Sequence, residues 1–304
     1  MMKQIVARGE PIPAALLAPL LDSSQLLREA DPTRLQQRFH EQGYLFVKQF
    51  FDRDDILAAR QEILQRLVEV GEIAEPALEG IFTGLSQRRE QVADLGKFWK
   101  SVSETWSLRR LSHSAALHDL MHTLLGGAAQ AQDYLFLRPA TPGKSTRIHC
   151  DYPFFTRATE AVATAWIALG EVPTELGPLF VLEGSHQWPD VIEGHRGFDV
   201  AVDTKRKASW EETPQEIACQ RRTRLLTADF AAGDLVVFGM FLLHGALDNV
   251  SMENRVRLSC DVRYQLASAV RDPRYFGAHP SGTTGIGYGE LIGAKPLTDE
   301  WHIR

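Results

Sequence analysis

The stretch DLVVFGMFLLHGAL, residues 234–247, is the strongest indication of the fold of the second half of the chain. It is apolar almost throughout and rich in β-branched and aromatic residues, which favours a buried strand over a helix. His244 follows the apolar run. A histidine in this position is often a hydrogen-bonded core residue, and it becomes a candidate metal ligand when neighbouring strands supply further ligand-type side chains.

Other short apolar or alternating stretches surround this one between residues 127 and 267, and turn residues separate them. Short strands at regular spacing are typical of a β-barrel or a β-sandwich. We therefore expect a chain that is mainly β with flanking helices. The remaining candidate strands are residues 133–140, 146–152, 161–172, 177–186, 224–230 and 255–267.

Helical patterns dominate the first part of the chain. Asp31 and Pro32 form a typical helix start, and residues 53–71 place Ile56, Ile63 and Leu67 on one face. We expect one domain over residues 1–304. Its parts are a helical region (about 31–126), a β core (about 132–267) with an insertion (about 187–220), and a covering tail (about 268–304).

Composition narrows the classes of partner. The chain has 33 Lys and Arg against 39 Asp and Glu, a net charge of −6, and no long basic run, so we expect no nucleic acid as a partner. Its three cysteines match no zinc motif or disulfide framework, which predicts a cytoplasmic protein. The apolar run at 13–21 is short and contains two prolines, so we expect no membrane span.

The sequence HCD, residues 149–151, places a histidine and an aspartate two positions apart in a predicted strand. Alternation puts His149 and Asp151 on one face, where an imidazole and a carboxylate can hold a cation. This spacing is also common in proteins that bind no metal, where such a pair is a surface or salt-bridged pair. The pair by itself is therefore weak evidence.

The combination of His149, Asp151 and His244 is more specific. Two imidazoles and one carboxylate supply three facial ligands and leave three positions open, as in non-haem Fe(II) sites that bind a co-substrate and dioxygen. Zinc also accepts this set, although its closed structural sites favour four ligands rich in cysteine.

An arginine-bearing strand follows, ENRVRLSCDVRYQ, residues 253–265. Arg255 stands 11 residues after His244 (255 − 244), far enough for a turn and a return on the adjacent strand. A guanidinium there can hold a carboxylate through two parallel hydrogen bonds. For Arg257 and Arg263 we expect ordinary exposed ion pairs.

Taken in this order, the motifs resemble the phytanoyl-CoA dioxygenase family of Fe(II)/2-oxoglutarate oxygenases. The resemblance covers about residues 34–265 and rests on HCD, AWIALGEV (165–172), GPLFVLEGSH (177–186), the histidine strand and the later arginine. It implies a double-stranded β-helix (jelly-roll, cupin-like) core. It also implies iron on His149, Asp151 and His244, 2-oxoglutarate on Arg255, and Trp166 near the co-substrate, although plain core packing explains Trp166 nearly as well.

The activity implied is hydroxylation of a small organic metabolite by dioxygen, with 2-oxoglutarate converted to succinate and CO2. Asp151 favours hydroxylation, because related halogenases replace this carboxylate with a small residue. Desaturation and epoxidation stay open. The alternative is a cupin-like protein that binds a metal and a ligand without oxidation, against which the position of Arg255 argues.

Two further positions bear on ligands. Ala246 stands where serine is frequent in the family, which removes one hydrogen bond to 2-oxoglutarate. Arg147 precedes His149 by two residues, so an unbroken strand points it into the same cavity. A buried guanidinium needs an anion, either a protein carboxylate or an acidic group on the substrate. The sequence indicates neither the substrate nor the oligomeric state.

Overall fold

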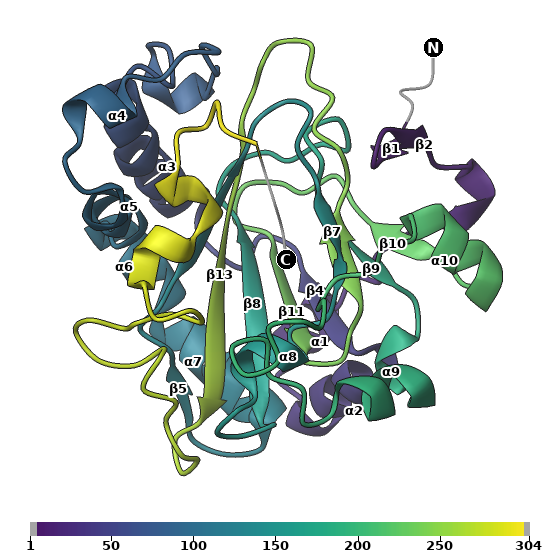
Figure 1. Ribbon diagram of the computed structural model, residues 1–304. Helices are drawn as coiled ribbons and strands as arrows, with labels where there is room; N and C mark the ends of the chain where they lie inside the picture. Colours follow the sequence, from purple (N-terminus) through teal and green to yellow (C-terminus); the bar gives the residue numbers. More distant parts are fainter. Residues whose placement is uncertain (1–4, 301–304) are drawn as a thin grey trace.

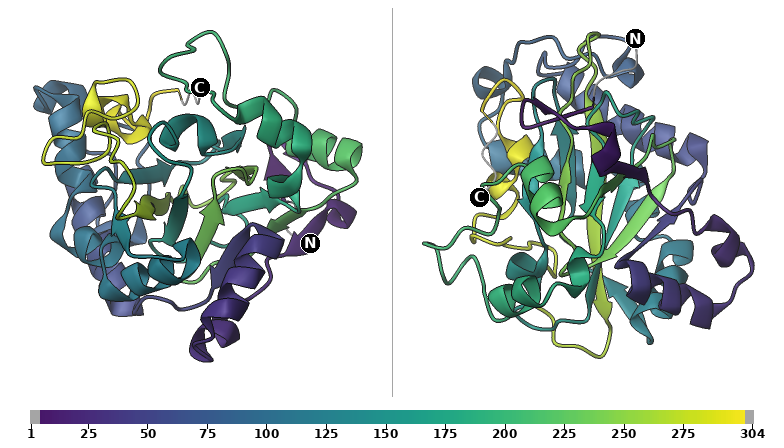
Figure 2. Two further views of the ribbon diagram at one scale, coloured as in Figure 1. Left: turned by 90° about the horizontal axis from the view of Figure 1, so that it is seen from below. Right: turned by 90° about the vertical axis from the view of Figure 1, so that its right-hand side faces the viewer.

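Two β-sheets face each other across the middle of the molecule (Figures 1 and 2). The structure is a computed structural model that describes residues 5–300. β3 pairs with β10 in parallel, and the other described pairs in the smaller sheet are antiparallel. The smaller sheet has the order β3 (Leu17–Pro19), β10 (Leu225–Thr227), β9 (Leu179–Leu182), β12 (His244–Ala246) and β7 (Thr146–His149).

The larger sheet is antiparallel throughout its described pairs. Its longest strand bonds to one neighbour over most of its length and to two short strands on the other side. In order, the strands are β4 (Tyr44–Val47), β11 (Leu235–Gly239), β8 (Val162–Ala168) and β13 (Arg257–Leu266), with β5 (Ala129–Ala131) and β6 (Phe136–Ala140) both on the far side of β13. A separate hairpin joins β1 (Val6–Ala7) to β2 (Glu10–Pro11).

Alternation along the larger sheet produces two apolar cores. One set of side chains points toward the smaller sheet, where Trp166 and Phe238 pack with Val181 and Leu226. The other set, which includes Leu258, points outward under the helices. Part of the space between the sheets is thus filled with apolar side chains, and the remainder is available for the polar residues described below.

Helices of the N-terminal region cover the outer face of the larger sheet (Figure 1). The predicted helix start is present, since the Asp31 carboxylate accepts a hydrogen bond from the backbone N–H of Arg34. The predicted face of α3 is also buried, including Ile56, Ile63 and Leu67. The helices are α1 (Ser24–Arg28), α2 (Pro32–Gln42), α3 (Arg53–Val68), α4 (Arg88–Gln91), α5 (Leu95–Ser103), α6 (Trp106–Ser112) and α7 (Ala115–Leu125).

Two further segments, residues 187–220 and the C-terminal segment, contain helices beyond the N-terminal layer. α8 (Tyr152–Phe155) follows β7 directly, and residues 187–220 contain α9 (Pro189–His195) and α10 (Pro214–Arg221). The described part of the C-terminal segment, up to residue 300, has two 3-10 helices, η4 (Gly287–Glu290) and η5 (Ile292–Ala294), both of which contact α5. Short 3-10 helices also occur at Ala14–Leu16, Ala77–Glu79 and Ser185–Gln187.

The chain is therefore mixed α/β with a largely antiparallel β core, so helices form more of it than the prediction of a mainly β chain implied. The excess comes from the N-terminal helical layer and from the helices of residues 187–220. Within residues 5–300, no helix has both the length and the apolar character required to cross a membrane.

Candidate metal centre

His149, Asp151 and His244 meet between the two sheets, as the sequence predicted. His149 ends β7, His244 begins β12, and the two residues pair directly across these antiparallel strands. All three side chains are buried, and one possible ligand atom from each lies within 4.8 Å of the others. Nε2 of His149 is 3.7 Å and Nε2 of His244 is 3.9 Å from Oδ1 of Asp151.

Backbone carbonyls orient both imidazoles. Nδ1 of His149 lies 2.9 Å from the carbonyl oxygen of Arg147, and Nδ1 of His244 lies 3.0 Å from that of Leu242. Since a carbonyl oxygen only accepts, each Nδ1 carries the proton and each Nε2 offers its lone pair to the centre. Burial, reinforced by His244, lowers the pKa of His149 to about 3, and burial also lowers the pKa of His244, so both rings are neutral.

Asp151 is held through one of its two oxygens. Thr164 Oγ1 donates to Oδ2 at 2.6 Å, and Nη2 of Arg263 donates to the same oxygen at 2.9 Å. Burial opposes ionisation, but the Arg263 guanidinium and the hydrogen bond from Thr164 hold the pKa of Asp151 well below its usual range. Oδ1 is left facing the histidines. Two neutral imidazole nitrogens and one carboxylate oxygen form a donor set that suits Fe(II).

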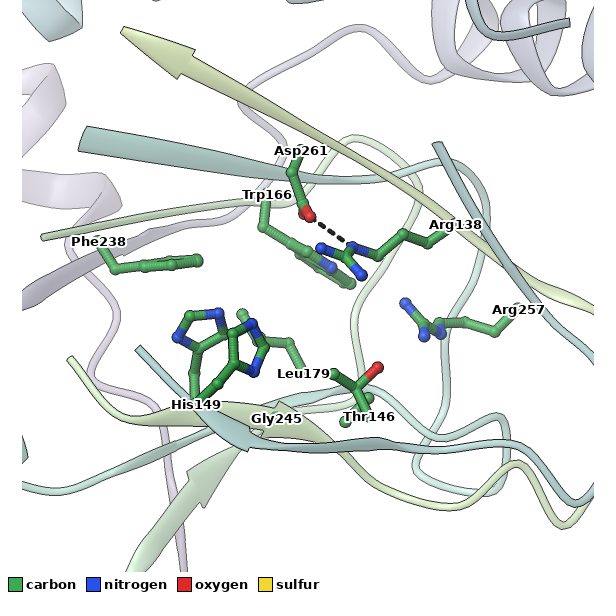
Figure 3. A pocket seen from close by; sticks show the side chains of 11 residues that line it. Arg138, Thr146, His149, Trp166, Leu179, Phe238, Gly245, Arg257 and Asp261 are labelled. Atoms are coloured by element: carbon green, nitrogen blue, oxygen red, sulfur yellow. Dashed lines mark hydrogen bonds and ion pairs between the residues drawn. The ribbon is translucent and has the colours of Figure 1, made fainter. Parts of the chain in front are cut away.

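A narrow cavity continues from these ligands between the sheets, and Figure 3 shows the side chains that line it. Arg138 and Asp261 form an ion pair in its wall, with Nε of the arginine 2.6 Å from Oδ2 of the aspartate. Trp166, Phe238 and Leu179 supply apolar surface. Trp166 lines this cavity, and it also packs against Phe230 at a ring-centroid distance of 4.7 Å. Its predicted place near the co-substrate stays a prediction beside the interpretation as core packing.

Arg257 is the unusual residue of this cavity. Its side chain is buried and donates through Nη1 to Oγ of Ser259 at 2.6 Å, whereas Nε and Nη2 have no hydrogen-bond partner among the described residues. Burial, together with the positive charge of Arg138, lowers the pKa of Arg257 to about 10. A buried guanidinium with free N–H groups is a costly arrangement that an incoming anion relieves.

Arg255, predicted to hold 2-oxoglutarate, lies elsewhere. It precedes β13 and pairs with Glu79 at 2.9 Å and with Glu253 at 2.7 Å, with 38% of its side chain exposed. The loop after β12 is longer than the count from His244 assumed, so β13 begins at Arg257. The placement of Arg255 in the cavity is therefore wrong, and the interpretation of Arg257 as an exposed ion-pairing residue is wrong as well.

Arg147, predicted to face the cavity, points away from it. Nη1 forms an ion pair with Glu211 at 3.0 Å, and 39% of the side chain is exposed. The cause is an irregularity between β7 and β12. His149 pairs with His244 and Thr146 with Ala246, so three steps along β7 match two along β12. The extra residue shifts the alternation, and Thr146 lines the cavity instead.

Sequence reasoning missed the groups that support the ligands. Arg263 was interpreted as an exposed ion-pairing residue, and Thr164 and Arg138 were not singled out. The alternation of RLSCDVRYQ along β13 could have identified Arg263, because it places Arg257, Ser259, Asp261 and Arg263 on the same face as one polar row. No comparable signal marks Thr164 within the apolar strand β8.

Comparison with known proteins agrees with this geometry. The model of the phytanoyl-CoA dioxygenase family matches residues 39–256, a range that contains all three ligand candidates. A 1-deoxypentalenic acid 11-beta-hydroxylase of Streptomyces exfoliatus is 28% identical over 269 residues, which cover 83% of this chain and 85% of the relative. Its namesake from Streptomyces arenae is 26% identical over 262 residues, with the same coverage of 83% and 85%.

Two solved structures share the fold. The epimerase SnoN, in complex with Fe3+, alpha ketoglutarate and nogalamycin RO, is 22% identical with a TM-score of 0.56, covering 88% of this chain and 93% of its own. The carbocyclase SnoK from nogalamycin biosynthesis is 20% identical with a TM-score of 0.55, covering 94% and 97%. The family match spans well over half of the chain, so this protein belongs to the phytanoyl-CoA dioxygenase family of Fe(II)/2-oxoglutarate-dependent oxygenases.

Proposed function

We propose that the protein hydroxylates a small organic molecule, and that its two facing sheets are the double-stranded β-helix core of the family. One observation carries the proposal. Of the buried His149, Asp151 and His244, the two histidines line the same narrow cavity as Arg257, a buried arginine with no ion-pair partner within residues 5–300. A site that only stored a metal would have no use for such a cation beside it.

His149 and His244 would hold iron through Nε2, and Asp151 would hold it through Oδ1. Their backbone and side-chain partners fix the three donors before the metal arrives, so little side-chain ordering remains to be done on binding. When bound, iron and 2-oxoglutarate supply the oxidising power, as dioxygen and 2-oxoglutarate are converted to succinate, CO2 and an oxygen atom for the substrate.

Arg257 would bind the distal carboxylate of 2-oxoglutarate. The other charges around the narrow cavity are already matched, because Arg263 faces Asp151 and Arg138 faces Asp261. Arg263 also has unpartnered N–H groups, but it is already paired with a carboxylate; of the described arginines that line the narrow cavity, Arg257 is the one that has free N–H groups and no ion pair. Two parallel hydrogen bonds from its guanidinium suit a carboxylate.

Thr146 would add a hydroxyl group to this carboxylate site. It lies directly across from Ala246, the position where serine is frequent in the family, and both residues line the cavity. The hydroxyl lost at Ala246 is thus available from the opposite strand. Trp166 would form the apolar wall beside the carbon chain of 2-oxoglutarate.

Hydroxylation rather than another outcome is supported by Asp151, which occupies the coordination position that halide needs in halogenases. A relative of 28% identity is named as a hydroxylase, which points the same way. The epimerase and carbocyclase share the fold at lower identity and do not decide the outcome for this chain.

Anaerobic titration with Fe(II) and 2-oxoglutarate tests the proposal. We expect a weak visible charge-transfer band and, after admission of oxygen, succinate formation. His122, an exposed histidine of α7, provides a matched control, so the band should persist in His122→Ala and disappear in His149→Ala. Metal binding without any succinate formation would favour the non-oxidising cupin-like alternative.

A further inference from the structure

A second and larger cavity opens beside the metal ligands. It has a volume of about 410 Å3 and shares His149 and Arg138 with the narrow cavity, while Asp151 also lines it. This size falls within the roughly 300–1,000 Å3 of ordinary small-molecule sites. A molecule bound there lies against the iron ligands, so this cavity is the place for the substrate that is oxidised.

The walls of this cavity are largely apolar. Aromatic rings from β6 and α8 form one side, Val200 of the insertion forms another, and the C-terminal segment closes the cavity across from them. Such walls favour a ligand with a hydrocarbon body, because binding removes the apolar surfaces of ligand and wall from water, which is favourable. The main apolar residues are Phe136, Phe154, Phe155, Val200, Leu291 and Ile292.

The two charged groups of the C-terminal wall differ in their partners. The Glu290 carboxylate accepts hydrogen bonds from the backbone N–H groups of Thr283 and Thr284, both at 2.5 Å, and from the hydroxyl of Tyr134 at 3.2 Å. It therefore serves the structure of the segment. The Lys295 ammonium has no ion pair or side-chain hydrogen bond within residues 5–300.

The backbone at Lys295 is nevertheless firmly placed. Fully buried Arg88 donates to the carbonyl oxygen of Lys295 at 2.7 Å and also to that of Gly293. Glu72, the ion-pair partner of Arg88, accepts a hydrogen bond from the backbone N–H of Leu297 at 3.0 Å. The backbone of Lys295 is thus fixed at the cavity wall, while its side chain remains free to contact a ligand.

The sum of the charges around both cavities indicates the sign of the charge that the ligand should carry. Bound iron and 2-oxoglutarate cancel as a dication and a dianion, and Asp151 and Asp261 each face an arginine. Arg257 and Lys295 remain against the single carboxylate of Glu290. The complete site therefore carries one positive charge in excess.

We propose that the substrate is an apolar monoanion, a free carboxylic acid whose hydrocarbon body fills the larger cavity and whose carboxylate meets Lys295. This rests on the proposed function, since the iron ligands are what assign the cavity to the substrate. An acyl-CoA thioester fits less well, because the thioester removes the free carboxylate and Lys295 alone would face several phosphate charges.

Paired probes of equal shape test the proposal in equilibrium binding. Adamantane-1-carboxylate and decanoate are compared with adamantane-1-carboxamide and decanamide by calorimetry, on protein loaded with Zn(II) and 2-oxoglutarate so that no oxidation occurs. We expect an acid to bind about tenfold more tightly than its amide, the value of one charged hydrogen bond. The preference should vanish in Lys295→Met and persist in Lys295→Arg.

Controls separate this inference from general effects. Lys205→Met removes an exposed lysine that lines neither cavity, and it should keep the preference. Lys295→Glu should reverse the sign, so that 1-adamantylamine binds more tightly than the carboxylate. Equal binding of acid and amide by wild-type protein, or an undiminished preference in Lys295→Met, overturns the proposal. Succinate formation by the wild-type enzyme decides the proposed function independently.

The location of the probe is tested with two valines of the insertion. Val200 lines the cavity, whereas Val202, two residues later, is 75% exposed and does not. Val200→Trp should fill the space and reduce acid binding about tenfold or more, and Val202→Trp should leave it unchanged. Equal behaviour of the two variants would place the acid outside this cavity.

Discussion

Strand β13 and the β7–β12 pair both send side chains into the space between the sheets, but they do so by opposite means. β13 runs for ten residues without a break, and regular alternation lines up Arg257, Asp261 and Arg263 on one face. β7 and β12 are short, and their register shifts between the pair at His149 and the pair at Thr146.

The two arrangements meet different geometric requirements of the site. The proposed carboxylate-binding group and the groups that support the ligands need a fixed spacing over a long distance, which one continuous strand provides. The metal ligands must converge on a point, and an irregularity that re-aims side chains serves this purpose. Regular strands can be read from sequence, whereas a register shift between two strands cannot.

The largest expected effect comes from the irregular pair. His149→Ala or His244→Ala should reduce iron affinity by more than about 100-fold, because even groups behind a ligand are worth about 10–100-fold. Iron stoichiometry after anaerobic loading measures the effect. Normal iron content in both variants would remove the β7–β12 pair from the metal site.

The next effect comes from the regular strand. Arg257→Leu should weaken 2-oxoglutarate binding by on the order of 2–4 kcal/mol, roughly 30- to 800-fold, through loss of the charged partner of a carboxylate. Arg255→Leu, the same change two residues earlier, should have little effect because Arg255 is exposed and paired with Glu79 and Glu253. Titration of the charge-transfer band with 2-oxoglutarate measures the affinity of both variants. A large loss in Arg255→Leu with little change in Arg257→Leu would restore the assignment of 2-oxoglutarate binding to Arg255.

Arg263→Leu tests whether β13 also supports the metal. Asp151 would lose Arg263, its one arginine partner within residues 5–300, and keep Thr164, so we expect iron affinity to fall by about 10–100-fold. Arg263→Lys should recover part of the loss by restoring the charge. Thermal unfolding of the metal-free proteins provides the control, since iron affinity should remain low in Arg263→Leu even at temperatures where the variant is fully folded.

The exchange of hydroxyl groups across β7 and β12 should give a smaller effect. Ala246→Ser should strengthen 2-oxoglutarate binding by about 0.5–1.5 kcal/mol, and Thr146→Val should weaken it by a similar amount, the net worth of one hydrogen bond. Both affinities come from the same titration. A strengthening by Ala246→Ser together with a weakening by Thr146→Val would show that the hydroxyl group comes from the opposite strand here.

Arg147→Ala should have the smallest effect. Its exposed ion pair with Glu211 is worth about 0–1 kcal/mol in unfolding free energy. Because the side chain points away from both cavities, the preference for acid over amide should be unchanged. If the preference were lost in Arg147→Ala and kept in Lys295→Met, Arg147 of β7 would be the group that binds the anion.

Sequence could predict what local rules control. The cap at Asp31 and the buried face of α3 follow from capping chemistry and helical spacing. The three ligand candidates were accessible because His149 and Asp151 are two residues apart and His244 follows an apolar strand. Their convergence needed the family resemblance as well, since nothing local brings β7 to β12.

The errors have physical causes of a different kind. Arg255 was chosen by counting from His244, but the count includes a loop whose length no local rule fixes. Arg147 was placed by alternation, which the shift between β7 and β12 breaks. Lys295 lies in a segment of little regular structure, and its place depends on contacts with Arg88, more than 200 residues earlier.

If the C-terminal segment selects the substrate as proposed, its anchoring separates substrate selection from oxidation. Arg88 bonds its backbone, and Gly293 lies so close to Trp99 of α5 that an added Cβ would come within 1.9 Å of the indole ring. Of the proposed iron ligands, in contrast, His149 and His244 lie in strands of the smaller sheet, and Asp151 follows β7 by two residues. We therefore expect that residues 281–297 can be exchanged as one unit for the corresponding segment of a relative, with the oxidising site retained and the substrate changed.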